Sequence, residues 1–468
     1  MIKAKELQQF VDKYWDEQIF ETLSEYICIP NKSVAFDPDW KKNGYVDQAL
    51  ELVLNWLEKQ NLTDSKLHVG KLENRTPLIL LEFPGELDHQ VLMYGHLDKQ
   101  PEMEGWREGL EPWKAVYEDG KLYGRGGADD GYAIFSSVCA IKALREQGIP
   151  LPRIVLLVEF SEESGSRDLP AYMDHYKDII DKPDTIICLD SGAGNYEQLW
   201  MTNSLRGSVG GTLEVKVLTE GVHSGDASGI VPSSFRVLRS LLDRIQDSMS
   251  GKIFPKELNV EIPEERLNEV KATAEVLKKQ IYEKFPFFGD TEPLHDDHSE
   301  LILNRTWRAA LSCLGIDGMP EIENAGNVLR PYTKLRLSLR IPPTLDSKKA
   351  GKFLESVFAS DRMHGIAVEA EFKRGATGWN CPKYSPKLKS LLHEVSNEYF
   401  GKPAMFMGEG GSIPFMGKLA KQFPKAQFVV TGVLGPASNA HGPNEFLHIP
   451  FAKKLTSCIA HILGSVAD

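Results

Sequence analysis

Short apolar runs alternate with amphipathic stretches along residues 1–205. The runs are rich in β-branched residues and show little polar alternation, which is typical of strands buried on both faces of a parallel sheet. They lie at residues 77–83, 89–94, 153–160 and 185–189. Apolar residues recur at helical spacing in the intervening segments 46–59, 131–147 and 169–180. Strand and helix patterns in alternation predict an open α/β sheet.

A second pattern begins after Leu205. Half-exposed strands are predicted at 208–218, 334–341 and 367–372, with amphipathic helices at 232–249 and 347–358. This order favours a small α+β domain with a one-sided antiparallel sheet. The highly charged stretch 264–284 is interpreted as a helix with an exposed face. A helix at 385–399, a strand at 427–433 and a closing helix at 451–463 then restore the α/β character.

The predicted fold class is therefore α/β, with an insertion. Residues 1–205 and 378–468 form one discontinuous domain, a mostly parallel sheet with helices on both faces. Residues 206–377 form an inserted α+β, ferredoxin-like domain. Each part is within the usual size range of a domain.

Composition excludes several classes of protein. Hydrophobic residues make up 42% of the chain and charged residues 26%, as in globular proteins. The formal charge of −12, without a Lys/Arg cluster, argues against a nucleic-acid partner. No apolar run approaches the roughly 18 residues of a membrane span, so no membrane association is expected. The six cysteines are widely spaced and no export signal is visible, which favours free thiols and a cytoplasmic location.

Three predicted strands run directly into chemically active side chains. They lead into Gly95-His96-Leu97-Asp98, into Ser161-Glu162-Glu163 and into Asp190-Ser191-Gly192. Ligands of open α/β sheets bind at the carboxyl ends of the strands, so parallel neighbours would bring these residues to one edge. Two further segments carry similar residues: the glycine-rich Gly124-Arg125-Gly126-Gly127-Ala128-Asp129-Asp130, and Ser438-Asn439-Ala440-His441 near the chain's end. The first lacks the spacing of a dinucleotide or phosphate loop, and its acids would repel a phosphate.

Two histidines and three or four carboxylates, without a thiolate, suit two divalent ions of the Zn, Mn or Co type. Such a pair generates hydroxide near neutral pH. Of the adjacent Glu162 and Glu163, one can ligate while the other accepts the proton of the water. Asp98 is placed to orient the imidazole of His96.

In this order and with these gaps, the motifs resemble the co-catalytic di-zinc metallopeptidase family of cytosolic dipeptidases, carnosinases, glutamate carboxypeptidases, aminoacylases and succinyl-diaminopimelate desuccinylases. The resemblance covers nearly the whole chain. It implies that Asp129 bridges two ions, most often zinc, with His96 and Asp190 on one ion and Glu163 and His441 on the other. It also implies Glu162 as general base, Asp98 behind the first histidine, and a cis peptide between Asp129 and Asp130.

The inserted domain then resembles the family's lid and dimerisation domain. Gly221-Val222-His223-Ser224-Gly225 matches a signature whose histidine reaches the active site of the neighbouring subunit of a homodimer and stabilises the oxyanion. Asn327 and Arg340 match lid residues that hold substrate, and Gly411 and Ser412 lie in the matching glycine-rich loop. The chain departs from the family at Gly131-Tyr132, where relatives usually have Lys-Gly. This difference is expected to alter how the following helix packs.

The function expected from this resemblance is hydrolysis of the amide bond of dipeptides or short peptides by a metal-bound hydroxide with Glu162 as base. Two alternatives stay open: an N-acyl-amino-acid deacylase, and a non-catalytic binding protein on the same scaffold. The expected partners are a small peptide or N-acyl amino acid and a second copy of the chain. No predicted strand leads into the segment His295-Asp296-Asp297-His298, so it is interpreted as a solvated loop and not as a metal site.

Overall fold

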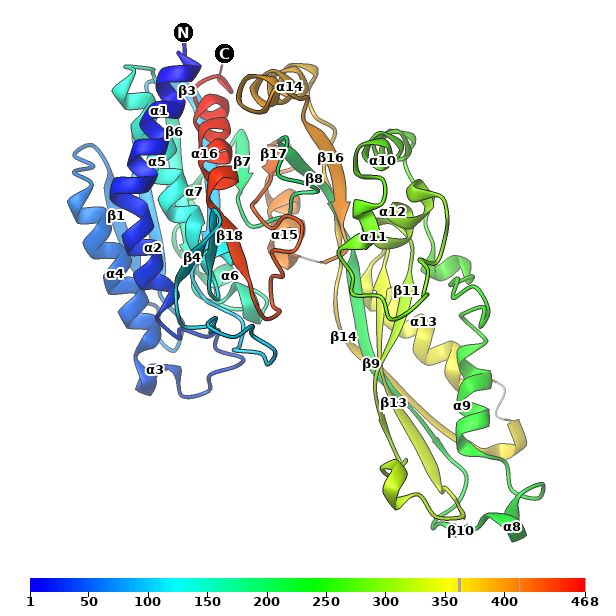
Figure 1. Cartoon of the computed structure of the whole chain (residues 1–468). Helices are drawn as coiled ribbons and strands as arrows, with labels where there is room; N and C mark the ends of the chain where they lie inside the picture. Colours follow the sequence, from blue (N-terminus) through cyan, green and yellow to red (C-terminus); the bar gives the residue numbers. More distant parts are fainter. Residues whose placement is uncertain (361–362, 412, 468) are drawn as a thin grey trace.

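The computed structural model describes residues 1–360, 363–411 and 413–467. A large α/β body contains both chain ends, which lie close together, and an elongated arm extends away from it (Figure 1). Among the described residues, no helix is long and apolar enough to cross a membrane.

The body is built on a six-stranded sheet in the order β1-β2-β6-β3-β7-β17. The strands are β1 Lys66–Gly70, β2 Leu78–Phe83, β3 Leu87–His96, β6 Pro152–Glu159, β7 Thr185–Cys188 and β17 Gln427–Val430. β6, β3, β7 and β17 run parallel to one another, while β1 and β2 are antiparallel to their neighbours. The mostly parallel sheet expected from the apolar runs is confirmed.

Helices cover both faces of this sheet. α4 Tyr45–Lys59 lies against the face that carries Leu67 and Leu81. α6 Leu169–His175 is followed by Tyr176, whose ring contacts His68 on the opposite face. The remaining helices of the body are α1 Ala4–Tyr14, α2 Phe20–Ile27, α3 Trp40–Asn43, α5 Tyr132–Glu146, α7 Lys177–Ile180, α14 Pro386–Phe400, α15 Pro414–Gln422 and α16 Ile449–Leu463.

Two small sheets extend the body toward the site and the arm. One is β18 Phe446–His448, β5 Lys121–Tyr123 and β4 Val116–Glu118, in that order. The other is β15 Trp379–Asn380, β8 Trp200–Leu205 and β16 Met405–Glu409. The sequence patterns did not predict these short strands.

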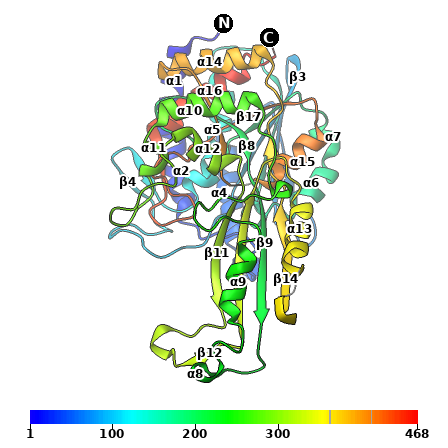
Figure 2. The same cartoon turned by 90° about the vertical axis from the view of Figure 1, so that its right-hand side faces the viewer.

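The arm contains the antiparallel sheet β11-β13-β9-β14. Its strands are β9 Gly207–Lys216, β11 Ala310–Asp317, β13 Tyr332–Ile341 and β14 Ala367–Ala376, with helices α9 Ser234–Leu242 and α13 Ser347–Ala359 packed on one face (Figure 2). The β-α-β-β-α-β order and strand arrangement are those expected of a ferredoxin-like insertion. At its far end lie β10 Val222–His223, β12 Val328–Leu329 and α8 Ser224–Ala227.

The charged stretch 264–284 is helical with an exposed face, as expected, and it carries the exposed Glu264, Lys271 and Glu275. Its inner face also holds two charged residues. α10 Glu264–Leu277 buries Arg266 and Glu269 as an ion pair 2.6 Å apart, because pairing lets both charges leave water. Apolar side chains of α10, α11 Gln280–Glu283 and α12 His298–Thr306 join the hydrophobic core of the body, whereas the arm has a separate core. The domain boundaries at 205/206 and 377/378 stay a prediction.

Candidate metal centre

The segments that follow the central parallel strands meet at one edge of the sheet. His96 ends β3, Glu162 and Glu163 lie in the turn Glu162–Ser164 after β6, and Asp190 follows β7. Since β6, β3 and β7 are parallel neighbours, their carboxyl ends converge, as the strand pattern led us to expect.

Asp129 and His441 arrive at this edge from two loops. Asp129 lies in the turn Gly127–Gly131 before α5, and its peptide bond to Asp130 is cis, as the resemblance implied. His441 precedes β18, which pairs with β5 and so places the His441 loop beside the Asp129 loop.

Five side chains form two groups of three that share Asp129. In the first, His96 Nε2 lies 3.3 Å from Asp129 Oδ1 and 3.8 Å from Asp190 Oδ2. In the second, His441 Nε2 lies 3.0 Å from Asp129 Oδ2 and 3.4 Å from Glu163 Oε2. In each group one nitrogen and two carboxylates offer ligand atoms within 4.8 Å of one another. The structure therefore brings together all five residues expected to bind metal.

The ligand atoms of the two groups are better placed to bind cations than to form hydrogen bonds with one another. Within the described part of the chain, His96 Nε2 and Glu163 Oε1 are buried without a hydrogen-bond partner. Burial, together with the charge of Asp129, raises the pKa of Glu163 well above its usual range. Burial likewise raises the pKa of Asp190 well above its usual range, against the opposing charge of His96. Crowded acids in a buried site are stabilised when positive ions enter, so these residues fit divalent cations of the zinc type.

Asp98 connects the two metal-binding segments that follow β3 and β6. Its backbone oxygen is 3.1 Å from His96 Nδ1, and its carboxylate oxygen Oδ1 is 3.5 Å from the same nitrogen. Its two carboxylate oxygens accept hydrogen bonds of 3.0 Å from the backbone N–H groups of Glu162 and Glu163. Asp98 therefore fixes the imidazole and the glutamate turn together.

Glu162 differs from its neighbour Glu163 in its contacts. The described residues provide no hydrogen-bond donor to the Glu162 carboxylate, whereas Glu163 Oε2 accepts a 2.6 Å hydrogen bond from Gln100. Burial, reinforced by the charge of Asp190, raises the pKa of Glu162 well above its usual range. A free carboxylate beside a metal centre is suited to accept a proton.

The residues Gly131 and Tyr132 pack closely at the start of α5. A Cβ atom at position 131 would lie 2.3 Å from Tyr26 Cε1, so only glycine fits there. The buried Tyr132 hydroxyl donates a 2.5 Å hydrogen bond to Leu189 O, next to Asp190. The departure from Lys-Gly thus links the Asp129 turn with the end of β7 and leaves the helix well packed.

The expected substrate residues lie in two separate places. Arg340, near the end of β13, pairs with Ser208 at the start of β9, Gly411 follows β16, and Ser412 lies outside the described residues. His223 and Asn327 lie together at the far end of the arm, where Ser224 N donates a 2.9 Å hydrogen bond to Asn327 O. The structure does not bring these two residues to the metal centre of their own chain.

Sequence reasoning assigned no role to Arg125 or Glu445, although both are in the quoted motifs. Their side chains form a buried ion pair through Arg125 Nη1 and Glu445 Oε2. Arg125 also donates to Gly442 O at 2.7 Å, and Gly126 N donates to Glu445 Oε1 at 2.8 Å. The pair therefore joins the loop of Asp129 to the loop of His441.

Replacing Glu445 with Gln should destabilise the protein and weaken metal binding, because Arg125 is left as a buried, unbalanced charge. The expected loss is about 3–5 kcal/mol of unfolding free energy, with less than the full metal content after dialysis. Chemical denaturation and elemental analysis measure the two effects. Arg308 and Glu300 form a half-exposed pair 2.6 Å apart, so Glu300→Gln is the matched control. Full metal content and unchanged stability in Glu445→Gln would show that the pair does not hold the two loops.

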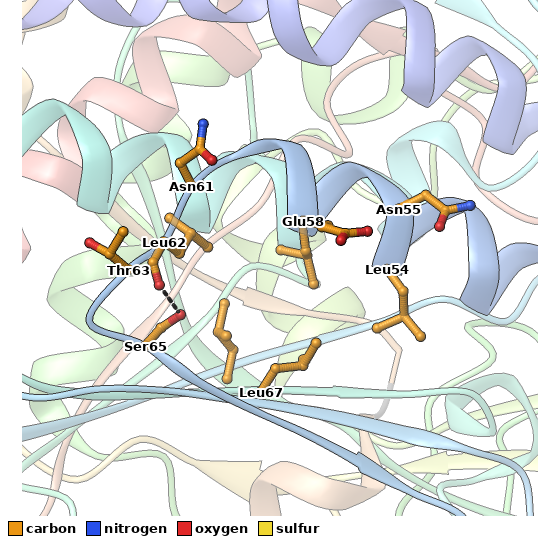
Figure 3. A pocket seen from close by; sticks show the side chains of 10 residues that line it. Leu54, Asn55, Glu58, Asn61, Leu62, Thr63, Ser65 and Leu67 are labelled. Atoms are coloured by element: carbon orange, nitrogen blue, oxygen red, sulfur yellow. Dashed lines mark hydrogen bonds between the residues drawn. The ribbon is translucent and has the colours of Figure 1, made fainter.

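Two other features do not form part of the centre. A cavity of about 460 Å³ between α4 and β1 is lined by five leucines and five polar side chains, and Glu58 is its one acidic residue (Figure 3). In the segment from His295 to His298, Asp297 caps α12 by accepting a hydrogen bond from Ser299 N, and His295 accepts one from Asp297 N. His295 is exposed, in keeping with the solvated loop expected there.

The chain was compared with known protein families. The family model described as peptidase family M20/M25/M40 matches residues 92–465. The chain belongs to this family. It is therefore an enzyme, a metal-dependent peptidase, and the resemblance carried by the sequence motifs is confirmed.

Relatives of this M20 peptidase include two dipeptidases. The Beta-Ala-His dipeptidase of Homo sapiens is 28% identical over 462 residues, which cover 93% of this chain and 87% of the relative. The cysteinylglycine-S-conjugate dipeptidase of Corynebacterium striatum is 25% identical over 380 residues, or 78% of this chain and 79% of the relative.

Solved structures share the fold of this M20 peptidase. Human carnosine dipeptidase 1 superposes with a TM-score of 0.77 at 22% identity, covering 100% of this chain and 99% of the other. Dug1p, a dipeptidase from Saccharomyces cerevisiae, gives a TM-score of 0.74 at 22% identity, covering 99% and 98%. These matches span both the body and the arm.

Proposed function

We propose that this M20 peptidase is a dipeptidase that hydrolyses the amide bond of dipeptides or short peptides. The observation that carries the proposal is the pair of three-residue groups sharing Asp129, with the unengaged carboxylate of Glu162 beside them. The dipeptidase names of relatives that align along most of the chain support this substrate class.

His96, Asp129 and Asp190 would hold one divalent ion, and Asp129, Glu163 and His441 the other, with zinc the expected metal and Mn or Co alternatives. Two such ions supply hydroxide near neutral pH and polarise a carbonyl group. Glu162 takes the proton released by the attacking water and returns it to the leaving amine. Asp98 keeps His96 and the glutamate turn in place, which preserves the position of Glu162.

Substrate is held from the side of the arm. Arg340 lies close enough to Arg206 for its charge to lower the pKa of that residue, which in turn donates a hydrogen bond to Gly410 O. Arg340 binds the substrate carboxylate, since its guanidinium can engage both oxygens. His223 donates a hydrogen bond to the developing oxyanion from the neighbouring subunit, with Asn327 beside it. This role requires a homodimer formed through the arm.

Several features of the arm support a dimer. β11 is an edge strand that exposes Leu314 by 65% and Ile316 by 50%. The far end exposes Ile230 by 82% and Ile322 by 87%. An unpaired strand edge and apolar side chains close to His223 favour association with a second copy.

A substrate panel tests the proposed function. Purified protein supplied with Zn²⁺ or Mn²⁺ is assayed on dipeptides, including cysteinylglycine and β-alanyl-histidine, and on N-acetyl and N-succinyl amino acids. We expect turnover of dipeptides that is abolished by a chelator and restored by added metal. Activity confined to the acylated compounds would replace the dipeptidase with the deacylase alternative, and metal binding without any turnover would favour the non-catalytic one.

A further inference from the structure

Four cationic side chains gather where the arm joins the body, beside the segment that ends β16. They are Arg206, Lys284, Arg305 and Arg340. Arg206 follows β8 and donates hydrogen bonds to three backbone oxygens, those of Gly410 at 3.3 Å, Asn304 at 3.1 Å and Arg308 at 3.3 Å. Arg206 therefore holds the loop and α12 through its Nε and Nη1 groups.

Arg305 is less completely bonded. One of its terminal nitrogens lies 3.1 Å from Met407 Sδ, a weak acceptor, and its Nε is buried without a partner among the described residues. A Cβ built on Gly410 would lie 3.4 Å from Arg305 Cγ and 3.3 Å from Arg206 Nη2, so the loop runs directly over both arginines. The guanidinium of Arg305 keeps unused donors at this junction.

The positive charge of the cluster is only partly balanced: the carboxylate of Glu409 is near enough to raise the pKa of Lys284 against the effects of burial and Arg305. Within the described part of the chain, none of the four side chains forms an ion pair, whereas the nearby Arg308 pairs with Glu300. Burial, followed by the charges of Arg340 and Arg305, lowers the pKa of Arg206 to about 10. Burial of its ammonium, followed by the charge of Arg305, lowers the pKa of Lys284 to about 8, although the residue as a whole is exposed. Binding of an anion would therefore stabilise the charged forms of these side chains.

The cluster borders the metal centre. Glu409 Oε1 would lie 2.8 Å from a Cβ built on Gly192, and Gly192 follows Asp190 by two positions. The next residue, Gly410, lies over the arginines, and Gly411 after it has no heavy atom within 4 Å of its Cβ position. A substrate that extends from the metal centre past this loop therefore reaches the cations.

We propose that Arg305 and Lys284 form a subsite for a second carboxylate, that of an acidic C-terminal side chain, beside the main-chain carboxylate held by Arg340. The proposal rests on the proposed dipeptidase function and deepens it. With one substrate carboxylate on Arg340, only the charge of Glu409 opposes those of Arg305 and Lys284, and a second carboxylate offsets the remaining positive charge of this pair. The preferred substrates are then dipeptides that end in aspartate or glutamate.

The test compares alanyl-glutamate with alanyl-glutamine, which have nearly the same shape but differ by one charge. We expect wild-type kcat/KM to be at least about tenfold higher for alanyl-glutamate, the range of a well-formed charged contact. In Arg305→Met this ratio should fall at least about tenfold. Arg308→Met, which removes an arginine three positions away that Glu300 already neutralises, should keep the wild-type ratio.

Binding of the free amino acids gives a readout that needs no turnover. The metal-loaded protein is titrated calorimetrically with L-glutamate and L-glutamine, and the glutamate preference should be lost in Arg305→Met and reduced in Lys284→Gln. If Arg305→Met fails to fold, Lys284→Gln carries the test, because Lys284 is exposed. Equal turnover and equal binding of the two partners by wild type would overturn the subsite while dipeptide hydrolysis stands. If no dipeptide is cleaved, the proposed function fails, and the calorimetry alone then decides on the subsite.

Discussion

Replacement of Glu162 by Gln should lower kcat by about 10²- to 10⁴-fold, the contribution of a positioned general base, without loss of bound metal. Glutamine has nearly the shape of glutamate but cannot accept the proton of the attacking water. The Glu162 carboxylate makes no hydrogen bond to a described residue, so the amide group introduced by glutamine disturbs no existing hydrogen bond. Stopped assays give kcat, and elemental analysis gives the metal content.

The adjacent residue provides the matched control. Glu163 has the same side chain, but its Oε2 lies 3.4 Å from His441 Nε2 within the second metal-binding group. Glu163→Gln should therefore lose metal as well as activity. If Glu162→Gln loses metal in the same way, or if it retains most of the wild-type kcat, Glu162 is not the base. The assignment of Glu162 as base and Glu163 as metal ligand is then wrong.

The fold and the metal centre could be predicted because their signals are local. Each buried strand is one continuous apolar run, and the residues at its end and within the next few positions reach the sheet edge. His96, Glu163 and Asp190 follow from this rule. Asp129 and His441 lie on loops whose position no periodicity defines, and the motif resemblance was needed to place them.

The sequence patterns could not predict contacts between segments that lie far apart in the chain. Arg125 and Glu445 are separated by 320 positions, and nothing in either segment identifies the other as its partner. The buried Arg266 and Glu269 looked like exposed charges because their remaining contacts, such as that of Glu269 with Asn203 at 2.7 Å, come from the body. The cluster around Arg305 is likewise assembled from segments on β8, α12 and the arm.

The position of His223 on the arm bears on which active site it serves, that of its own chain or that of a second copy. His223 is exposed and ends β10, which lies at the far end of the arm, away from the body (Figure 1). Its Nδ1 accepts a 3.1 Å hydrogen bond from Gly225 N, which fixes the ring and leaves Nε2 directed elsewhere. A donor held in this way and aimed at an oxyanion contributes about 10²- to 10³-fold to kcat.

His223→Ala should therefore lose about 10²- to 10³-fold in kcat without losing metal, and its defect should be complemented by a partner that is defective elsewhere. Co-expression of His223→Ala and Glu162→Gln chains with different tags yields a heterodimer by sequential affinity purification. If His223 acts across the interface, one of the two sites combines an intact Glu162 with an intact His223, so the heterodimer has about half of the wild-type activity. If His223 acted within its own chain, both sites would lack one residue and the heterodimer would be as inactive as its parents. Light scattering on the same sample measures its mass, and an active monomer would contradict both the dimer and the shared site.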